Sequence, residues 1–317
     1  MSKNLLFNQG QLGLPNIGSI ERSEQAFADA FLSAAKILCK HLTQITSAIE
    51  VIEDFTSEPF NLAILGLFSK MRCNYYSYVL LEIHHDQLGS QFLIEHLCEA
   101  AITLTYLVEE ADRSIFSEYI SASECQAHSL LNDVKEQLQK FPTHSELLIL
   151  REKLNTFITK QQNHTTEFSL GPNPEVCLWE PQGAETTAKR GAIVGLNFLT
   201  NPARQIALRA VPASWLDLQL NYVSSFAKIS FIKGQSEINF RYLRDAAHIC
   251  LHATQSFLEE VDQHQNIKLH NIEHQQQILN MLYEWFYNAH QCYQLPCCAT
   301  AHEQRDNRIK QYKGRHE

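Results

Sequence analysis

The stretch "FADAFLSAAKILCKHLTQITSAIEVI", residues 27–52, decides the fold class. Its apolar side chains recur every three or four residues, which places them in one stripe along one face of an α-helix. The stripe consists of Phe27, Phe31, Ala34, Leu38, Leu42, Ile45, Ile49 and Ile52. The pattern predicts a helix over residues 19–54, and a helix of that length is typical of a helical bundle.

Stripes of the same period follow along most of the chain, and no segment has the alternation or the β-branched clusters of a strand. Capping signals mark several helix starts, as in the Thr143–Glu146 and Ser214–Asp217 capping boxes. Further helices are predicted from about residue 57, then over 88–110, 113–139, 144–161, 214–232, 236–262 and 269–294. The stretch 183–211 is ambiguous, with room for a short helix near 186–198 and another near 202–210. The sequence therefore predicts an all-α, multi-helix bundle of eight or nine helices.

The segment 162–182 differs from its surroundings, because it contains Gly171, Pro172, Pro174 and Pro181. Glycine and proline clusters of this kind interrupt helices and mark loops. We therefore expect this loop to join two helical parts, which can form two lobes. The full division is an N-terminal segment 1–18, helical parts 19–161 and 183–298, the loop 162–182, and a polar tail 299–317.

Composition limits the function classes. The 317 residues carry a formal net charge of −9, which argues against a protein that coats nucleic acid along its whole surface. The nine cysteines are scattered and odd in number, and the start of the chain has no signal-peptide pattern, so we expect reduced thiols in the cytoplasm. No run approaches the roughly 20 apolar residues of a membrane helix, so no membrane is expected.

The stretch "FRYLRDAAHICLH", residues 240–252, contains the strongest candidate for chemistry. Arg241 and His248 have an R-x6-H spacing, and HEPN ribonucleases use an arginine followed by a histidine at such a distance. The arginine would hold a phosphate and the histidine would move a proton, with no metal needed. The alternative is a solvated helix face, since an arginine and a histidine two turns apart are common by chance.

Two histidine pairs raise the question of a metal. His248 and His252 are four residues apart on one predicted helix, and His270 and His274 repeat the spacing on the next. Such pairs can reach one metal ion from one side. If the two helices were antiparallel neighbours, the four histidines could form one site. Against this, His270 and His274 lie in a polar stretch that is typical of a helix start in solvent.

Residues 187–234 form a basic segment inside the acidic chain. The segment contains six basic side chains and one acidic side chain, Asp217, so its formal charge is +5. The basic side chains are Lys189, Arg190, Arg204, Arg209, Lys228 and Lys233. With Trp215 and Tyr222 nearby, this composition fits an anion-binding or RNA-binding surface, or a surface that acidic helices balance. Walker and dinucleotide-binding glycine patterns are absent, and we expect no cofactor.

Two stretches carry a family resemblance: "IEHLCEAAITLTYL" (94–107) and "NYVSSFAKIS" (221–230). They resemble an uncharacterised family of all-helical bacterial proteins that is grouped with abortive-infection-like and HEPN-like proteins. Glu99 matches the family's glutamate, Tyr222 its tyrosine and Ser225 its serine. Glu95 stands in place of the family's arginine and Lys228 in place of its histidine. The resemblance implies a helical fold and a link to phage defence, and the two departures imply that chemistry has been lost.

Three functional hypotheses follow. The first is a non-catalytic intracellular interaction or regulatory protein, with a protein partner or a second copy of the chain. The second is a HEPN-like, metal-independent ribonuclease that uses Arg241 and His248. The third is a metal-binding helical protein that uses His248, His252, His270 and His274.

Overall fold

The computed structural model describes residues 12–50, 58–164, 179–196, 240–263 and 272–294. In these ranges the chain forms α-helices and one short 3-10 helix, η2, and it contains no strand, so the all-α prediction is confirmed. The elements are η2 (Ile17–Ser19), α1 (Glu24–Glu50), α3 (Pro59–Ile83), α4 (Gln87–Glu109), α5 (Arg113–Lys140), α6 (Ser145–His164), α7 (Thr187–Ile193), α10 (Phe240–Gln263) and α11 (Ile272–Gln294).

Local sequence signals explain where several helices begin. The Asp112 carboxylate accepts a hydrogen bond from the Ile115 backbone N–H at 2.9 Å, and this cap starts α5. The Asp86 side chain caps α4 in the same way through the Gly89 N–H. Proline occupies the first turn of α3, where its missing N–H costs nothing. Helix α1 starts at Glu24, five residues after the predicted start, because η2 and a bend come first.

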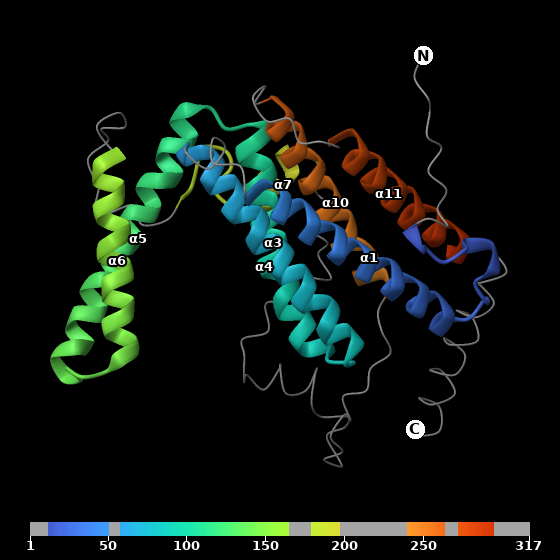
Figure 1. Cartoon of the computed structure of the whole chain (residues 1–317), viewed down its shortest axis with the longest axis horizontal. Helices are drawn as coiled ribbons and strands as arrows, with labels where there is room; N and C mark the ends of the chain where they lie inside the picture. The colour runs from blue at the N-terminus through green and yellow to red at the C-terminus, as the bar shows by residue number, and fades with distance from the viewer. Residues whose placement is uncertain (1–11, 51–57, 165–178, 197–239, 264–271, 295–317) are drawn as a thin grey trace, which may run out of the picture.

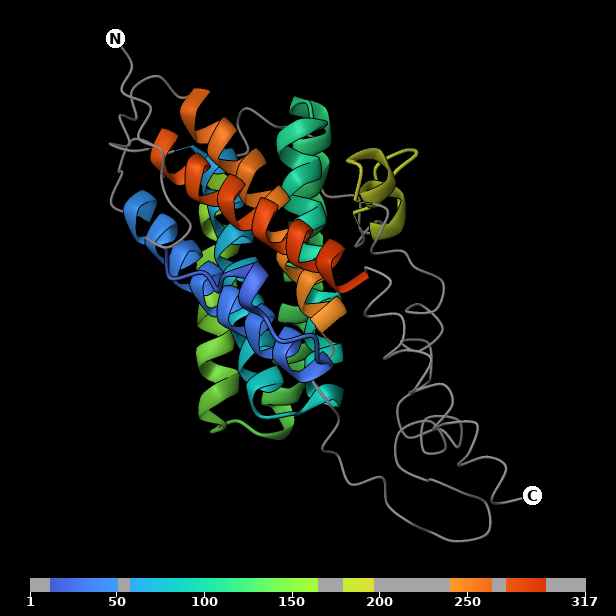
Figure 2. The same cartoon turned by 90° about the vertical axis from the view of Figure 1, so that its right-hand side faces the viewer.

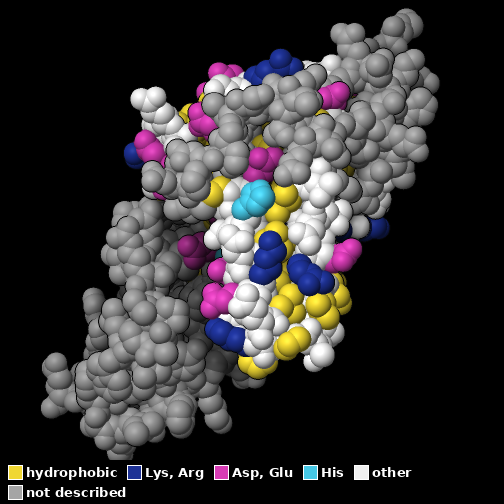
Figure 3. All heavy atoms as spheres, turned by 90° about the vertical axis from the view of Figure 1, so that its left-hand side faces the viewer, with side chains coloured by type: hydrophobic (Ala, Val, Ile, Leu, Met, Phe, Trp, Pro, Cys, Tyr) yellow, Lys and Arg dark blue, Asp and Glu magenta, His cyan; other side chains and the backbone are white. Residues whose placement is uncertain are grey.

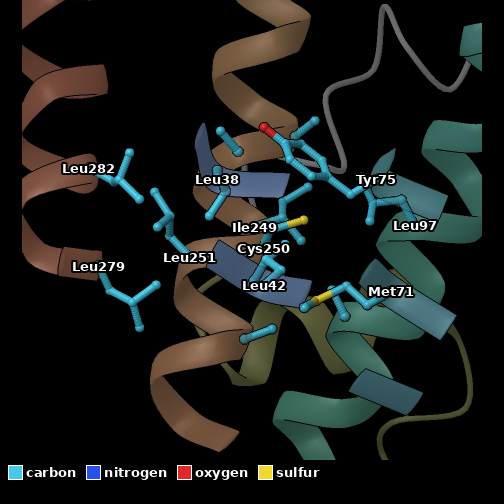
Figure 4. Close-up of a cluster of buried hydrophobic side chains, with 14 of the residues drawn as sticks. Leu38, Leu42, Met71, Tyr75, Leu97, Ile249, Cys250, Leu251, Leu279 and Leu282 are labelled. Carbon is cyan, nitrogen blue, oxygen red and sulfur yellow. The ribbon is translucent and has the colours of Figure 1, made fainter. Parts of the chain in front are cut away.

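The core draws on five helices that cross one another closely (Figures 1 and 2): α1, α3, α4, α10 and α11. Figure 4 shows part of it, where Leu38 and Leu42 of α1 meet Met71 and Tyr75 of α3, with Ile249 and Cys250 of α10 between them. Aromatic rings tie the same helices together. Phe31 lies 5.4 Å from the ring of Trp285, and Phe68 stacks on Phe257 at 4.4 Å.

The expected division into two lobes at 162–182 is wrong. One continuous core contains side chains from α1, α3 and α4 of the first predicted part and from α7, α10 and α11 of the second. The reason is that α10 is apolar on much of its circumference, so it packs against α1, α3, α4 and α11 together. A loop in the sequence therefore does not mark a boundary in the core.

Helices α5 and α6 form an antiparallel hairpin that stands out from the bundle (Figure 1). The first turns of α5 join the main core, where Phe116 lies 5.1 Å from Phe60. Farther out, the hairpin has a small core of its own, made of Ala127, Leu131 and Ile158. The hairpin is thus anchored at one end and held at the other mainly by contacts between its two helices.

Several sequence predictions fall outside the described ranges, including the helices at 202–210 and 214–232 and the tail 299–317. The short helix predicted at 186–198 is α7, which is only seven residues long.

None of the helices in the described ranges has the length and apolar character that crossing a membrane requires. The expectation of reduced thiols is wrong at Cys125, which is disulfide-bonded, because the spacing of cysteines in a sequence does not show which of them the fold brings together.

Candidate functional site

The polar side of α10 and the adjoining turns of α11 bring together the charged groups that the sequence singled out. We call this group the Arg/His face, and it consists of Arg241, Arg244, Asp245, His248 and His290. The apolar side of α10 fixes its orientation, since Leu243, Ala247 and Cys250 are fully buried. The periodicity of the helix then directs the arginines and His248 toward α11 and the surface.

The two arginines occupy different environments. Arg244 is half-buried, and its Nε donates a hydrogen bond to the Asp245 carboxylate at 2.8 Å. Part of its guanidinium group is therefore already bonded within the protein. Arg241 is exposed, and its guanidinium carbon lies 6.0 Å from the ring centroid of Tyr293. That distance is at the outer limit of a cation–π contact. Arg241 is therefore the more accessible of the two cations.

His248 is packed between α10 and α11 rather than presented to solvent. Its ring lies 5.0 Å from the ring of Tyr283 and 6.3 Å from that of Phe286. Its Nε2 is enclosed and has no hydrogen-bond partner within the described ranges. Burial, assisted by the charge of Arg244, lowers the pKa of His248 to about 4. The imidazole is thus neutral at pH 7.

A second histidine, His290 of α11, completes the face, and sequence reasoning missed it. Burial, followed by the charge of Arg244, lowers its pKa to about 4. Its Nε2 lies 2.9 Å from the Nε2 of Gln294, which leaves it hydrogen-bonded on one side. The available signal was the antiparallel pairing of two neighbouring amphipathic helices, but a single sequence does not give the register of that pairing.

The predicted pairing of Arg241 with His248 differs from the arrangement in the structure. Arg244, one turn from His248, lowers the pKa of both His248 and His290, whereas Arg241 lowers only that of His290 and less than Arg244 does. A histidine with a pKa near 4 is a weak base at neutral pH, because efficient general bases have a pKa near the working pH. The face therefore combines accessible positive charge with poor proton-transfer groups.

The four-histidine metal site is not assembled from those of its members that the structure describes. His248 adjoins Tyr283 and His290, His252 is exposed, and His274 lies near His41 of α1. His270 lies outside the described ranges. Over the residues that are described, no group of three or more histidine, cysteine, aspartate or glutamate side chains could hold a metal ion.

The structure describes only the start of the basic segment. There, Lys189 and Arg190 both contact other residues of the chain. Lys189 is exposed and pairs with Glu185 one turn before it. Arg190 is buried, so its prediction as a surface cation is wrong. Its Nη1 donates to the Ala184 carbonyl at 3.1 Å, and its guanidinium carbon lies 4.8 Å from the Trp179 ring centroid. The remaining predicted cations, Arg204, Arg209, Lys228 and Lys233, lie outside the described ranges.

Of the family-matched residues, the structure describes Glu99, whereas Tyr222 and Ser225 fall outside it. Glu99 is exposed on α4, and its charge acts on the pKa of both Arg190 and Tyr119. Burial lowers the pKa of Arg190, and Glu99 opposes that shift. Glu95, one turn earlier, is also exposed. Arg190 thus places a positive charge near Glu99 although position 95 has no arginine.

Comparison with known proteins gives partial similarities. No protein-family model matches the chain, and no solved structure matches it. Ninety residues are 32% identical to potassium voltage-gated channel subfamily V member 1 of Homo sapiens, covering 27% of this chain and 18% of that protein. For the Mus musculus protein of that name, the identity is 26% over 173 residues, covering 52% of this chain and 31% of the other. The chain spans less than a third of the length of either channel subunit.

Proposed function

We propose that this chain is a non-catalytic helical interaction or regulatory protein that works in the cytoplasm. The observation that carries the proposal is the state of His248, the best catalytic candidate in the sequence. Its Nε2 is enclosed beside Tyr283 and Phe286, and its pKa is lowered to about 4. A general base must reach the proton it takes and must hold it near neutral pH, and His248 is poorly suited to both tasks.

The shape of the molecule supports an interaction role. The α5–α6 hairpin extends from the bundle and exposes large apolar side chains at Leu130, Phe141 and Ile149. Several large exposed apolar side chains on one projecting element are typical of a binding surface. The link to phage defence rests on the family resemblance alone. The cytoplasmic location rests on the scattered cysteines of odd number.

The test is incubation of the purified chain with labelled single-stranded RNA and tRNA, with and without EDTA. A His248→Ala variant is compared with His252→Ala, which removes an exposed histidine one turn farther along the same helix. We expect no cleavage by any of the three proteins. Cleavage that survives EDTA, disappears in His248→Ala and persists in His252→Ala would refute the proposal.

One observation favours the second candidate, a metal-independent ribonuclease. Arg241, Arg244, His248 and His290 lie together, and both histidines are neutral at pH 7, the form that accepts a proton. In this mechanism the Tyr283 ring would have to move aside to admit the ribose hydroxyl. A Tyr283→Ala variant should then cleave RNA faster than the wild type, whereas the non-catalytic proposal predicts no cleavage by either.

A further inference from the structure

The outer part of the α5–α6 hairpin has a small core among the residues that the structure describes. Within the described ranges, α6 packs extensively against α5 alone. Only Ala127, Leu131 and Ile158 form the buried cluster between the two helices, with Leu154 and Phe157 partly covered beside it. Most of the stability of a helix in a protein comes from packing its apolar face against other elements. Within the described ranges, the outer hairpin therefore has a small core of its own for its length.

The unused apolar surface lies on the outside of the hairpin. Leu130 of α5 is 43% exposed, Ile149 of α6 is 56% exposed, and Phe141, directly after α5, is 57% exposed. Residues 147–150 of α6 are all leucine or isoleucine, so one full turn of this helix is apolar on every side. Figure 3 views the molecule from this side and shows hydrophobic side chains gathered along the hairpin between charged ones.

We propose that this face of the hairpin binds the same face of a second copy of the chain. Two hairpins would pack against each other about a two-fold axis and form a four-helix arrangement at the centre of a homodimer. An isologous contact of this kind needs only one self-complementary patch. The inference deepens the proposed interaction function by naming the partner.

The distribution of charge favours a second copy over a polyanion. Residues 130–158 contain four acidic side chains and four basic ones, so this region is neutral within a chain of net charge −9. Nucleic acid or an anionic membrane would require an excess of basic residues here. Two copies of an acidic protein repel each other over most of their surfaces, and contact through a neutral hairpin minimises that repulsion.

The size of the face also suits a dimer. Helix α6 has 20 residues and is therefore about 30 Å long. Two packed helices are roughly 20 Å wide, because their axes lie about 8–10 Å apart. One side of the hairpin thus covers about 600 Å², which is of the same order as the ~800 Å² per partner that stable interfaces bury.

Sedimentation equilibrium of the full chain tests this inference. The wild type should show a reversible dimer, and Ile149→Lys and Leu130→Lys should each weaken it at least about tenfold, since the charge would be buried twice in a two-fold interface. The matched control is Leu62→Lys, which changes a leucine of α3 that is 56% exposed on the bundle. This control should leave the dimer intact, and helicity measured by circular dichroism should be the same in all variants.

A wild type that stays monomeric at all concentrations would overturn the inference, and so would a dimer that neither hairpin variant weakens. A dimer that Leu62→Lys disrupts instead would place the interface on the bundle and overturn it as well. These outcomes are separate from the RNA assay. Cleavage of RNA would refute the non-catalytic function whatever the oligomeric state, whereas a monomer would refute only the identity of the partner.

Discussion

The stacked pair of Phe68 and Phe257 offers a direct test of the single core. Phe68 belongs to α3 and Phe257 to α10, so the pair joins two parts of the chain that the sequence assigned to different lobes. Both side chains are fully buried, and their rings lie 4.4 Å apart with an interplanar angle of 11°. If the core is continuous, a substitution at one residue must alter the loss of stability that a substitution at the other causes.

The expected magnitudes follow from the burial and geometry of the pair. Phe68→Leu and Phe257→Leu keep most of the side-chain volume, so each should lower the free energy of unfolding by about 1.5 kcal/mol. A direct aromatic contact contributes roughly 1 kcal/mol beyond the area that it buries. Because either single variant already removes that contact, the double variant should be less destabilised than the sum of the singles by about 1 kcal/mol.

The assay is urea unfolding of the four proteins, followed by circular dichroism. We expect one cooperative transition in each, since one shared core unfolds as a unit. Leu62→Ala serves as the control, because Leu62 of α3 is 56% exposed and its replacement should change stability by less than about 0.5 kcal/mol. Two separate transitions, or a coupling energy indistinguishable from zero, would refute the argument that the two parts share a core.

Four further predictions concern pH, two polar contacts and metal. Burial lowers the pKa of His41 to about 4. Between pH 6.5 and pH 4, this histidine is therefore protonated in the unfolded chain and neutral in the folded protein. Stability should thus fall as the pH drops from 6.5 toward 4, by on the order of 1 kcal/mol at pH 5.5 from this residue, and urea unfolding of His41→Leu should show a smaller fall. Trp285→Phe removes the 2.7 Å hydrogen bond from the indole Nε1 to the Pro15 carbonyl and should cost about 1 kcal/mol in the same assay. Arg190→Lys loses the guanidinium contacts to Ala184 and Trp179 and should cost about 1–2 kcal/mol in thermal unfolding. EDTA should leave the unfolding midpoint unchanged, because the described residues offer no group of three metal ligands; a lower midpoint would contradict this.

The apolar stripes were predictable because burial on a helix is a local, periodic property. Every predicted stripe residue from Phe27 to Ile49 is buried, and so are Ile64, Phe68 and Met71 of α3. The way in which stripes pair is not local. Helix α10 could have closed a second lobe with α11 alone, but its broad apolar surface also meets α1, α3 and α4. That choice depends on the packing of whole helices, which periodicity does not encode.

The candidate site was predictable in part for the same reason. The helical repeat put Arg241 and His248 on one face of α10, and both belong to the Arg/His face. The position of His248 relative to Tyr283 and His290 depends on the register between α10 and α11. That register decides whether the imidazole meets solvent or an aromatic ring, and hence whether its pKa is near 6.5 or near 4.

Glu99 and Arg190 show how the fold can bring a positive charge near a glutamate from a distant part of the sequence. Position 95 carries glutamate where the resemblance expects arginine, but α7 brings Arg190 within electrostatic range of Glu99. Helix α7 can approach α4 closely at Gly191, where a Cβ atom would lie 3.1 Å from the Ile102 side chain. Because the Arg190 guanidinium is buried and bonded to the Ala184 carbonyl, it holds this segment against the bundle and is not available to a substrate. Docking of α7 on α4 thus combines the close approach at Gly191 with a buried guanidinium that lies within electrostatic range of Glu99.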